Sequence, residues 1–110
     1  MLSTNKTITL NGRCFFGADR VGFTSDGTFI FSAWTTSPGE QRGSFFTTIP
    51  ISNREYRNEH CTMAAVSRGT GWIDIFDDWG TVHSIVSDEQ AVIDGLFAEC
   101  LNQGIVKITN

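Results

Sequence analysis

Only one segment of this chain, residues 87–104, has the apolar spacing of a helix. Ser87 and Gln90 have the spacing of a capping box at its start, and Gly104 suits the position just past its end. Its apolar residues form one continuous stripe: Val92, Ile93, Leu96, Phe97, Cys100 and Leu101. We therefore predict a single helix over residues 88–103, which leaves the rest of the core to be built from strands.

Short strands separated by turn residues account for the rest of the chain. Asn11-Gly12 and Asp26-Gly27 are residue pairs that favour tight two-residue hairpin turns. The segments with strand character are residues 7–10, 13–16, 21–25, 28–34, 44–49, 61–66, 72–76, 81–86 and 105–109. We predict an α+β fold in a single domain, residues 1–110. It consists of a mostly antiparallel sheet of roughly six to eight strands, one helix packed on it, and residues 105–109 as a closing strand.

The strand at residues 28–34 is apolar on both faces under this turn assignment. A two-residue loop at Asp26-Gly27 pairs Phe23 with Ile30, so alternate side chains divide between the two faces. One face carries Val21, Phe23, Ile30 and Trp34, and the other carries Phe29, Phe31 and Ala33. Such a strand lies between two layers of one chain, or one of its faces meets another subunit. Because only one helix is available to cover a sheet, we favour the second alternative, with Phe29, Phe31 and Trp34 at the interface.

Lys and Arg are absent from residues 69–106, and the chain has a net charge of -4. The acidic residues of this segment are Asp74, Asp77, Asp78, Asp88, Glu89, Asp94 and Glu99. Nucleic-acid-binding domains usually present a basic patch, so this distribution argues against direct nucleic-acid binding. It suits attraction to a basic protein partner, or it serves only to keep the protein in solution.

Three cysteines, Cys14, Cys61 and Cys100, occur without tight spacing. That pattern argues against a disulfide framework and for a reducing compartment. Residues 1–6 have no apolar stretch like that of a signal peptide, and no run approaches the ~20 apolar residues that span a membrane. We therefore expect a cytoplasmic protein with no membrane partner.

Residues able to carry chemistry are present, but none stands in a recognisable motif. Cys61 has His60 beside it and His83 further along the chain, so a cysteine-dependent enzyme is one hypothesis. Closely spaced Cys or His pairs for zinc are missing, and residues 74–80 lack the alternating acids of a calcium loop. We expect no cofactor and no metal.

The polar segment at residues 53–60 is one candidate for binding. It joins two apolar segments and contains Arg54, Tyr56, Arg57 and His60. Tyr and Arg often anchor recognition surfaces, and binding groups collect on loops. The alternative is a solvated loop whose charges pair locally.

An acidic hairpin tip at residues 77–80 is the second candidate. It contains Asp77, Asp78 and Trp79, and Trp72 lies near another strand end. Tryptophans at strand ends could line a groove or close the edge of the core. We include Asp77, Asp78, Trp72 and Trp79 among the candidate binding residues.

Short Thr-, Ser- and Gly-rich strands with Phe and Trp give a composition similar to that of small phage accessory proteins, a likeness that assigns no residue. We expect a non-enzymatic binding protein that acts as a symmetric oligomer, such as an inhibitor of a basic or nucleic-acid-handling protein. The second hypothesis is a carrier that binds a small anionic ligand between subunits through Arg54, Tyr56, Arg57 and a Trp. The third hypothesis is the cysteine-dependent enzyme.

Overall fold

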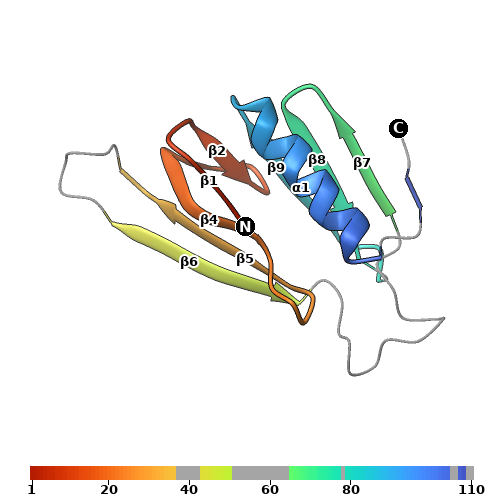
Figure 1. Cartoon of the computed structure of the whole chain (residues 1–110). Helices are drawn as coiled ribbons and strands as arrows, with labels where there is room; N and C mark the ends of the chain where they lie inside the picture. Colours follow the sequence, from red (N-terminus) through yellow and green to blue (C-terminus); the bar gives the residue numbers. More distant parts are fainter. Residues whose placement is uncertain (37–42, 51–64, 78, 105–106, 109–110) are drawn as a thin grey trace.

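The computed structural model describes residues 1–36, 43–50, 65–77, 79–104 and 107–108 (Figure 1). Within them the chain forms nine strands, paired antiparallel, and one helix, which confirms the predicted α+β class. The strands are divided between a four-stranded and a five-stranded sheet, whereas we expected a single sheet. The buried apolar residues nevertheless form one cluster.

The two sheets differ in the number and order of their strands. The four-stranded sheet has the order β1 (Leu2–Thr4), β4 (Gly17–Phe23), β5 (Thr28–Trp34) and β6 (Ser44–Pro50). The five-stranded sheet has the order β3 (Arg13–Phe15), β2 (Ile8–Leu10), β9 (Val82–Ser87), β8 (Trp72–Phe76) and β7 (Ala65–Gly69). The helix α1 (Gln90–Asn102) comes shortly after β9.

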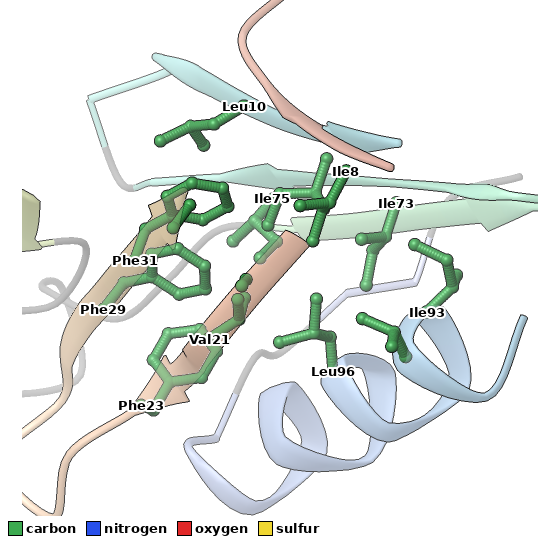
Figure 2. Packing of buried hydrophobic residues seen from close by; sticks show 14 of the residues in the cluster. Ile8, Leu10, Val21, Phe23, Phe29, Phe31, Ile73, Ile75, Ile93 and Leu96 are labelled. Atoms are coloured by element: carbon green, nitrogen blue, oxygen red, sulfur yellow. The ribbon is translucent and has the colours of Figure 1, made fainter. Parts of the chain in front are cut away.

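The core lies between the five-stranded sheet on one side and the helix with the four-stranded sheet on the other. Helix α1 contacts β7, β8 and β9, and it also contacts β1 and β4 of the other sheet. Figure 2 shows Val21 and Phe31 of the four-stranded sheet near Ile75 of the five-stranded sheet, with Leu96 of the helix beside them. The helix therefore covers only part of the five-stranded sheet, and the four-stranded sheet covers the rest.

Phe29 and Phe31 lie in this core with 0 % exposure. The Phe31 ring centroid is 5.2 Å from that of Phe15, and the Phe29 ring meets Phe23 edge-on at 5.2 Å. A side chain buried inside one chain has no surface to offer to a second subunit. The subunit interface expected at Phe29 and Phe31 is therefore corrected to a core position within the chain. Trp34 is half-buried at the end of β5.

The hairpin between β4 and β5 has a three-residue loop, which shifts the expected register by one residue. The Thr24 N–H donates to the Thr28 carbonyl (2.8 Å), and the Gly27 N–H donates to the Thr24 carbonyl (3.1 Å). Gly27 has φ +86°, the left-handed conformation that follows a type I turn in such loops. Phe23 consequently pairs with Phe29, and Val21 with Phe31, so these β4 residues share the buried face of β5 instead of the face of Ile30 and Trp34, which is half-buried.

The helix begins at Gln90, later than the predicted residue 88, because Ser87 belongs to β9. Ser87 is buried, and its Oγ accepts a hydrogen bond from the Glu89 N–H (3.1 Å). Glu89 is the N-cap but makes no side-chain capping bond; its carboxylate accepts from the Thr4 hydroxyl (2.6 Å). The Gln90 side chain accepts from the Gly71 N–H (2.7 Å). The expected capping box is thus not formed, because Ser87 binds the Glu89 N–H while the Glu89 and Gln90 side chains bind distant segments.

The chain beyond the helix approaches β7. The Val66 N–H donates to the Lys107 carbonyl (3.0 Å), and Ile108 forms a parallel bridge with Val66. These contacts lie within the predicted closing strand, whose residues 105, 106 and 109 are outside the described residues. The edge of β7 is therefore occupied by the C-terminal segment.

Candidate interaction site at the β8–β9 turn

The turn that joins β8 to β9 is held by the carboxylate of Asp77. Its Oδ1 accepts hydrogen bonds from the N–H groups of Trp79 (3.0 Å) and Thr81 (2.8 Å). The Asp77 N–H donates to the Thr81 carbonyl (3.0 Å), and the Gly80 N–H donates to the Asp77 carbonyl (3.1 Å). Asp side chains commonly stabilise turns by accepting nearby backbone N–H groups in this way. Side chain and backbone together therefore fix the conformation of this turn.

The other carboxylate oxygen of Asp77 faces His83. The distance between His83 Nε2 and Asp77 Oδ2 is 3.3 Å, and both side chains are nearly buried. The Nδ1 atom of His83 is buried and has no hydrogen-bond partner among the described residues. A histidine that acts as a general base needs a nitrogen in reach of the reacting group. With Nδ1 buried, this pair is suited to anchoring the turn to β9.

Trp79 stands on this turn with 89 % of its surface exposed. Its backbone N–H is bound to Asp77, so the backbone is held in place while the indole remains in solvent. Tryptophan buries a large apolar area when it packs, and it is enriched among the residues that dominate protein interfaces. Trp79 is therefore the described side chain whose exposure points most directly to a partner.

The outward face of the five-stranded sheet carries a second set of apolar side chains. Trp72, Val82 and Val86 are between 36 % and 47 % exposed, and Trp72 pairs with Val86 across β8 and β9. Trp72 opens β8 and Trp79 lies beyond its end, so the two indoles do not line one groove. Our sequence analysis missed Val82 and Val86, although their alternation with buried residues of β9 was the available signal.

Several candidate residues lie outside the described part of the chain: Arg54, Tyr56, Arg57, His60, Cys61 and Asp78. The hypotheses that depend on them remain predictions. Of the other two cysteines, Cys14 is exposed and Cys100 is buried. Burial, together with the charge of neighbouring Glu99, raises the pKa of the Cys100 thiol to about 12. This thiol stays protonated near neutral pH, so Cys100 is a core residue and not a nucleophile.

Three further features of the described residues concern metal ions, membrane spans and cavities. No group of three or more His, Cys, Asp or Glu side chains among them is placed to hold a metal ion. In the same residues, no helix is long and apolar enough to cross a membrane. A hollow of about 240 Å³ beside the start of the helix is lined by Ser3, Thr4, Asn5, Lys6 and Glu89. The Thr4 hydroxyl and the Glu89 carboxylate in its wall already bind each other.

No protein-family model, no curated protein and no solved structure matches this chain. Within the described residues, the Asp77–His83 pair and the exposed Trp79 are the features that the fold brings together at one place.

Proposed function

We propose that this chain is a non-enzymatic binding protein that engages a basic protein partner and works as a symmetric oligomer. The observation that supports the proposal most directly is Trp79, 89 % exposed on a turn tied by Asp77. Association is opposed by the conformational entropy of the groups that must be ordered. A turn that is already fixed by hydrogen bonds loses little further entropy when its tryptophan docks.

The surroundings of Trp79 are acidic, which sets the expected charge of the partner. Strands β8 and β9 and helix α1 contain no Lys or Arg. Asp74 lies partly exposed on β8, and Asp77 holds the turn itself. The nearest basic side chain along the sequence, Arg68, is paired with Asp94 of the helix (2.8 Å). Because complementary charge speeds encounter and suppresses partners of the wrong sign, a basic surface is the expected counterpart.

The anionic-ligand carrier and the cysteine-dependent enzyme remain alternative hypotheses. The carrier hypothesis uses Arg54, Tyr56 and Arg57, and the enzyme hypothesis uses Cys61. These residues lie outside the described part of the chain. No described contact favours either hypothesis over the binding protein.

The proposal is tested by immobilising the wild-type protein, a Trp79→Ala variant and a Phe16→Ala variant, and passing a lysate of the source cells over each. Phe16 is an exposed aromatic residue between β3 and β4, so its variant is the matched control. Bound proteins are identified by mass spectrometry and eluted with salt from about 50 mM to about 500 mM. We expect a basic protein that is retained by the wild type and by Phe16→Ala, and retained at least about tenfold less by Trp79→Ala.

Two results would contradict the proposal. The first is equal retention of the same proteins by Trp79→Ala and the wild type. The second is retention of proteins that are not basic, with no dependence on salt. Circular dichroism of both variants checks that a loss of retention comes from the missing indole and not from unfolding.

A further inference from the structure

Strand β6 forms an edge of the four-stranded sheet and pairs only with β5 among the described residues. It has seven residues, Ser44–Pro50, and none of them is charged. Figure 1 shows it on the margin of the molecule farthest from the helix. A long, uncharged edge strand is a template for pairing with another chain, and proteins usually protect such edges.

The other sheet edges in the described residues have that protection. Strands β1 and β3 have three residues each, too few for an extended ladder. Strand β1 also contacts the helix, and β3 carries the exposed Arg13. The edge of β7 is occupied, because the Val66 N–H already donates to the Lys107 carbonyl. Strand β6 is therefore the described edge that is long and uncharged and that no other segment among the described residues covers.

The register shows which backbone groups of β6 point away from β5. Along an antiparallel ladder, hydrogen-bonded pairs alternate with pairs that are not hydrogen-bonded. The Thr35 N–H donates to the Gly43 carbonyl (3.1 Å), so the next pair, Trp34 with Ser44, is not hydrogen-bonded. By alternation, the N–H and C=O groups of Ser44, Phe46 and Thr48 face outward. Pro50 falls in the same outward set, where its missing N–H costs no bond to β5.

The side chains of β6 are also incompletely covered. Phe29 and Phe31 of β5 are fully buried, whereas their partners on β6, Ile49 and Thr47, are only half-buried. Phe46, on the opposite face, is 57 % exposed. An added strand beside β6 would extend the cover over both faces of this edge.

We propose that β6 pairs antiparallel with β6 of a second copy of this chain, which joins two four-stranded sheets into one continuous sheet. The two-fold axis passes through Thr47, so all seven residues of each strand are paired. Phe46 then faces Thr48 of the second copy, and Phe45 faces Ile49. The outward groups form about six interchain hydrogen bonds.

A second copy is the occupant because the strand is complementary to itself. A two-fold axis places β6 beside an identical strand. Because β6 has no charged residue, the two strands do not repel each other through like charges. The inference rests on the proposed function, in that it names the contact of the symmetric oligomer. It uses no residue of the Trp79 turn.

The first experiment is sedimentation velocity of the full chain over a series of concentrations, with Thr48→Pro and Thr48→Val variants. The N–H of Thr48 points away from β5, so proline at 48 removes an interchain donor and leaves the β5–β6 ladder intact. Valine at 48 keeps that donor and is the matched control. We expect dimers for the wild type and Thr48→Val, and a dissociation constant at least about tenfold higher for Thr48→Pro.

A wild-type chain that stays monomeric at every concentration overturns the proposal, and so does a Thr48→Pro variant that dimerises as tightly as the wild type. A monomeric chain that instead captures an extended segment of a different protein also overturns it. Circular dichroism of Thr48→Pro checks its fold. If that variant does not fold, a cross-linking experiment decides the question.

The cross-linking experiment compares Thr47→Cys, Thr48→Cys and the wild type under mild oxidation. At the two-fold axis the Thr47 Cα atoms are about 4.5 Å apart, within the range that a disulfide bridges. The two Thr48 Cα atoms are offset along the strands beyond about 7 Å. We expect a reducible dimer for Thr47→Cys alone. A dimer that forms equally in the wild type, or only with Thr48→Cys, contradicts the proposed register.

The two proposals fail independently. Trp79→Ala keeps β6 unchanged, so we expect it to dimerise like the wild type. Thr48→Pro keeps the Trp79 turn unchanged, so we expect this monomer to retain the basic partner on the column. Loss of partner retention in Trp79→Ala with the dimer intact tests the binding function alone, and loss of the dimer in Thr48→Pro tests the β6 contact alone.

Discussion

The carboxylate of Glu99 on the helix occupies the space beside the backbone of Gly22 on β4. A Cβ atom placed on Gly22 would lie 2.7 Å from Glu99 Oε2 and 2.8 Å from Oε1. Glu99 Oε1 accepts a hydrogen bond from the Phe23 N–H (3.3 Å) and lies 3.4 Å from the Met1 ammonium. Gly22 has φ +153°, at the limit of the region that favours glycine. The missing side chain at Gly22 therefore lets the helix dock against β4.

We expect Gly22→Ala to lower the free energy of unfolding by more than about 1 kcal/mol, because alanine is disfavoured at this φ and displaces the Glu99 carboxylate. Urea denaturation measures the change. In a Glu99→Ala background the steric part of the cost disappears, so the same substitution should cost at least about 0.5 kcal/mol less there. An equal cost in both backgrounds would show that the two residues are not coupled.

Asp77→Ala should lower the free energy of unfolding by about 2 kcal/mol, because it removes an acceptor for two backbone N–H groups and leaves buried His83 without its partner. Asp77→Asn keeps an oxygen that accepts the N–H groups of Trp79 and Thr81, so we expect a cost below about 1 kcal/mol. Chemical denaturation of both variants measures the difference. Equal costs would mean that the side-chain oxygen does not hold the turn.

The two cysteines of the described residues should react differently with iodoacetamide at about pH 8. Cys14 is exposed and should be alkylated in the folded protein, whereas the buried Cys100 should react only after unfolding. Peptide mapping by mass spectrometry distinguishes the two sites. Alkylation of Cys100 in the folded protein at the rate of Cys14 would contradict the core assignment.

The raised pKa of Cys100 also predicts a dependence of stability on pH. An unfolded cysteine ionises near pH 8.5, roughly, whereas the pKa of folded Cys100 is about 12. The folded state therefore holds the proton more tightly, and this contribution to stability is complete below about pH 8.5 and declines as the pH rises toward 12. A Cys100→Ala variant should lose less stability between about pH 8 and about pH 10 than the wild type.

The hydroxyl of Thr24 donates a hydrogen bond to the Asp26 carboxylate, and the Thr28 N–H donates to the same oxygen (3.1 Å). Both hydrogen bonds hold the pKa of Asp26 below its ordinary value, and the bond from Thr24 has the larger effect. These bonds therefore stabilise the folded state at pH values above the ordinary aspartate pKa of about 3.9. The contribution is lost as the pH falls through the lower pKa of Asp26 in the folded state. Thr24→Ala should raise the pKa of Asp26, and Thr24→Ser should not, as an NMR titration of the carboxyl group will show.

Contacts between neighbours in sequence were predictable. Asn11 and Gly12 have φ +51° and +84°, as the predicted hairpin turn requires. The helix was found because its stripe faces the core, where Ile93 and Leu96 are fully buried. Asp77 and Trp79 were recognised as the tip of an acidic hairpin for the same reason, since a turn is built from residues a few positions apart.

Contacts between distant segments were not predictable in the same way. At Asp26-Gly27 a two-residue and a three-residue loop both accept a glycine with positive φ, and the sequence does not choose between them. The observed loop allows Phe23 and Phe29 to pack against each other in the core. Ser87 has the chemistry of an N-cap, but its pairing with Ile8 of β2 and the bond from its N–H to the Gly71 carbonyl keep it in β9.

The sequence by itself determined the α+β class, one helix near the C-terminal end and the positions of most turns, because periodicity and turn chemistry are local properties. Only the tertiary structure decided that the strands divide into two sheets and that Phe29 and Phe31 face inward. Those features depend on which distant strands pair. The pairing is driven by the burial of apolar surface over the chain as a whole, which no single segment determines.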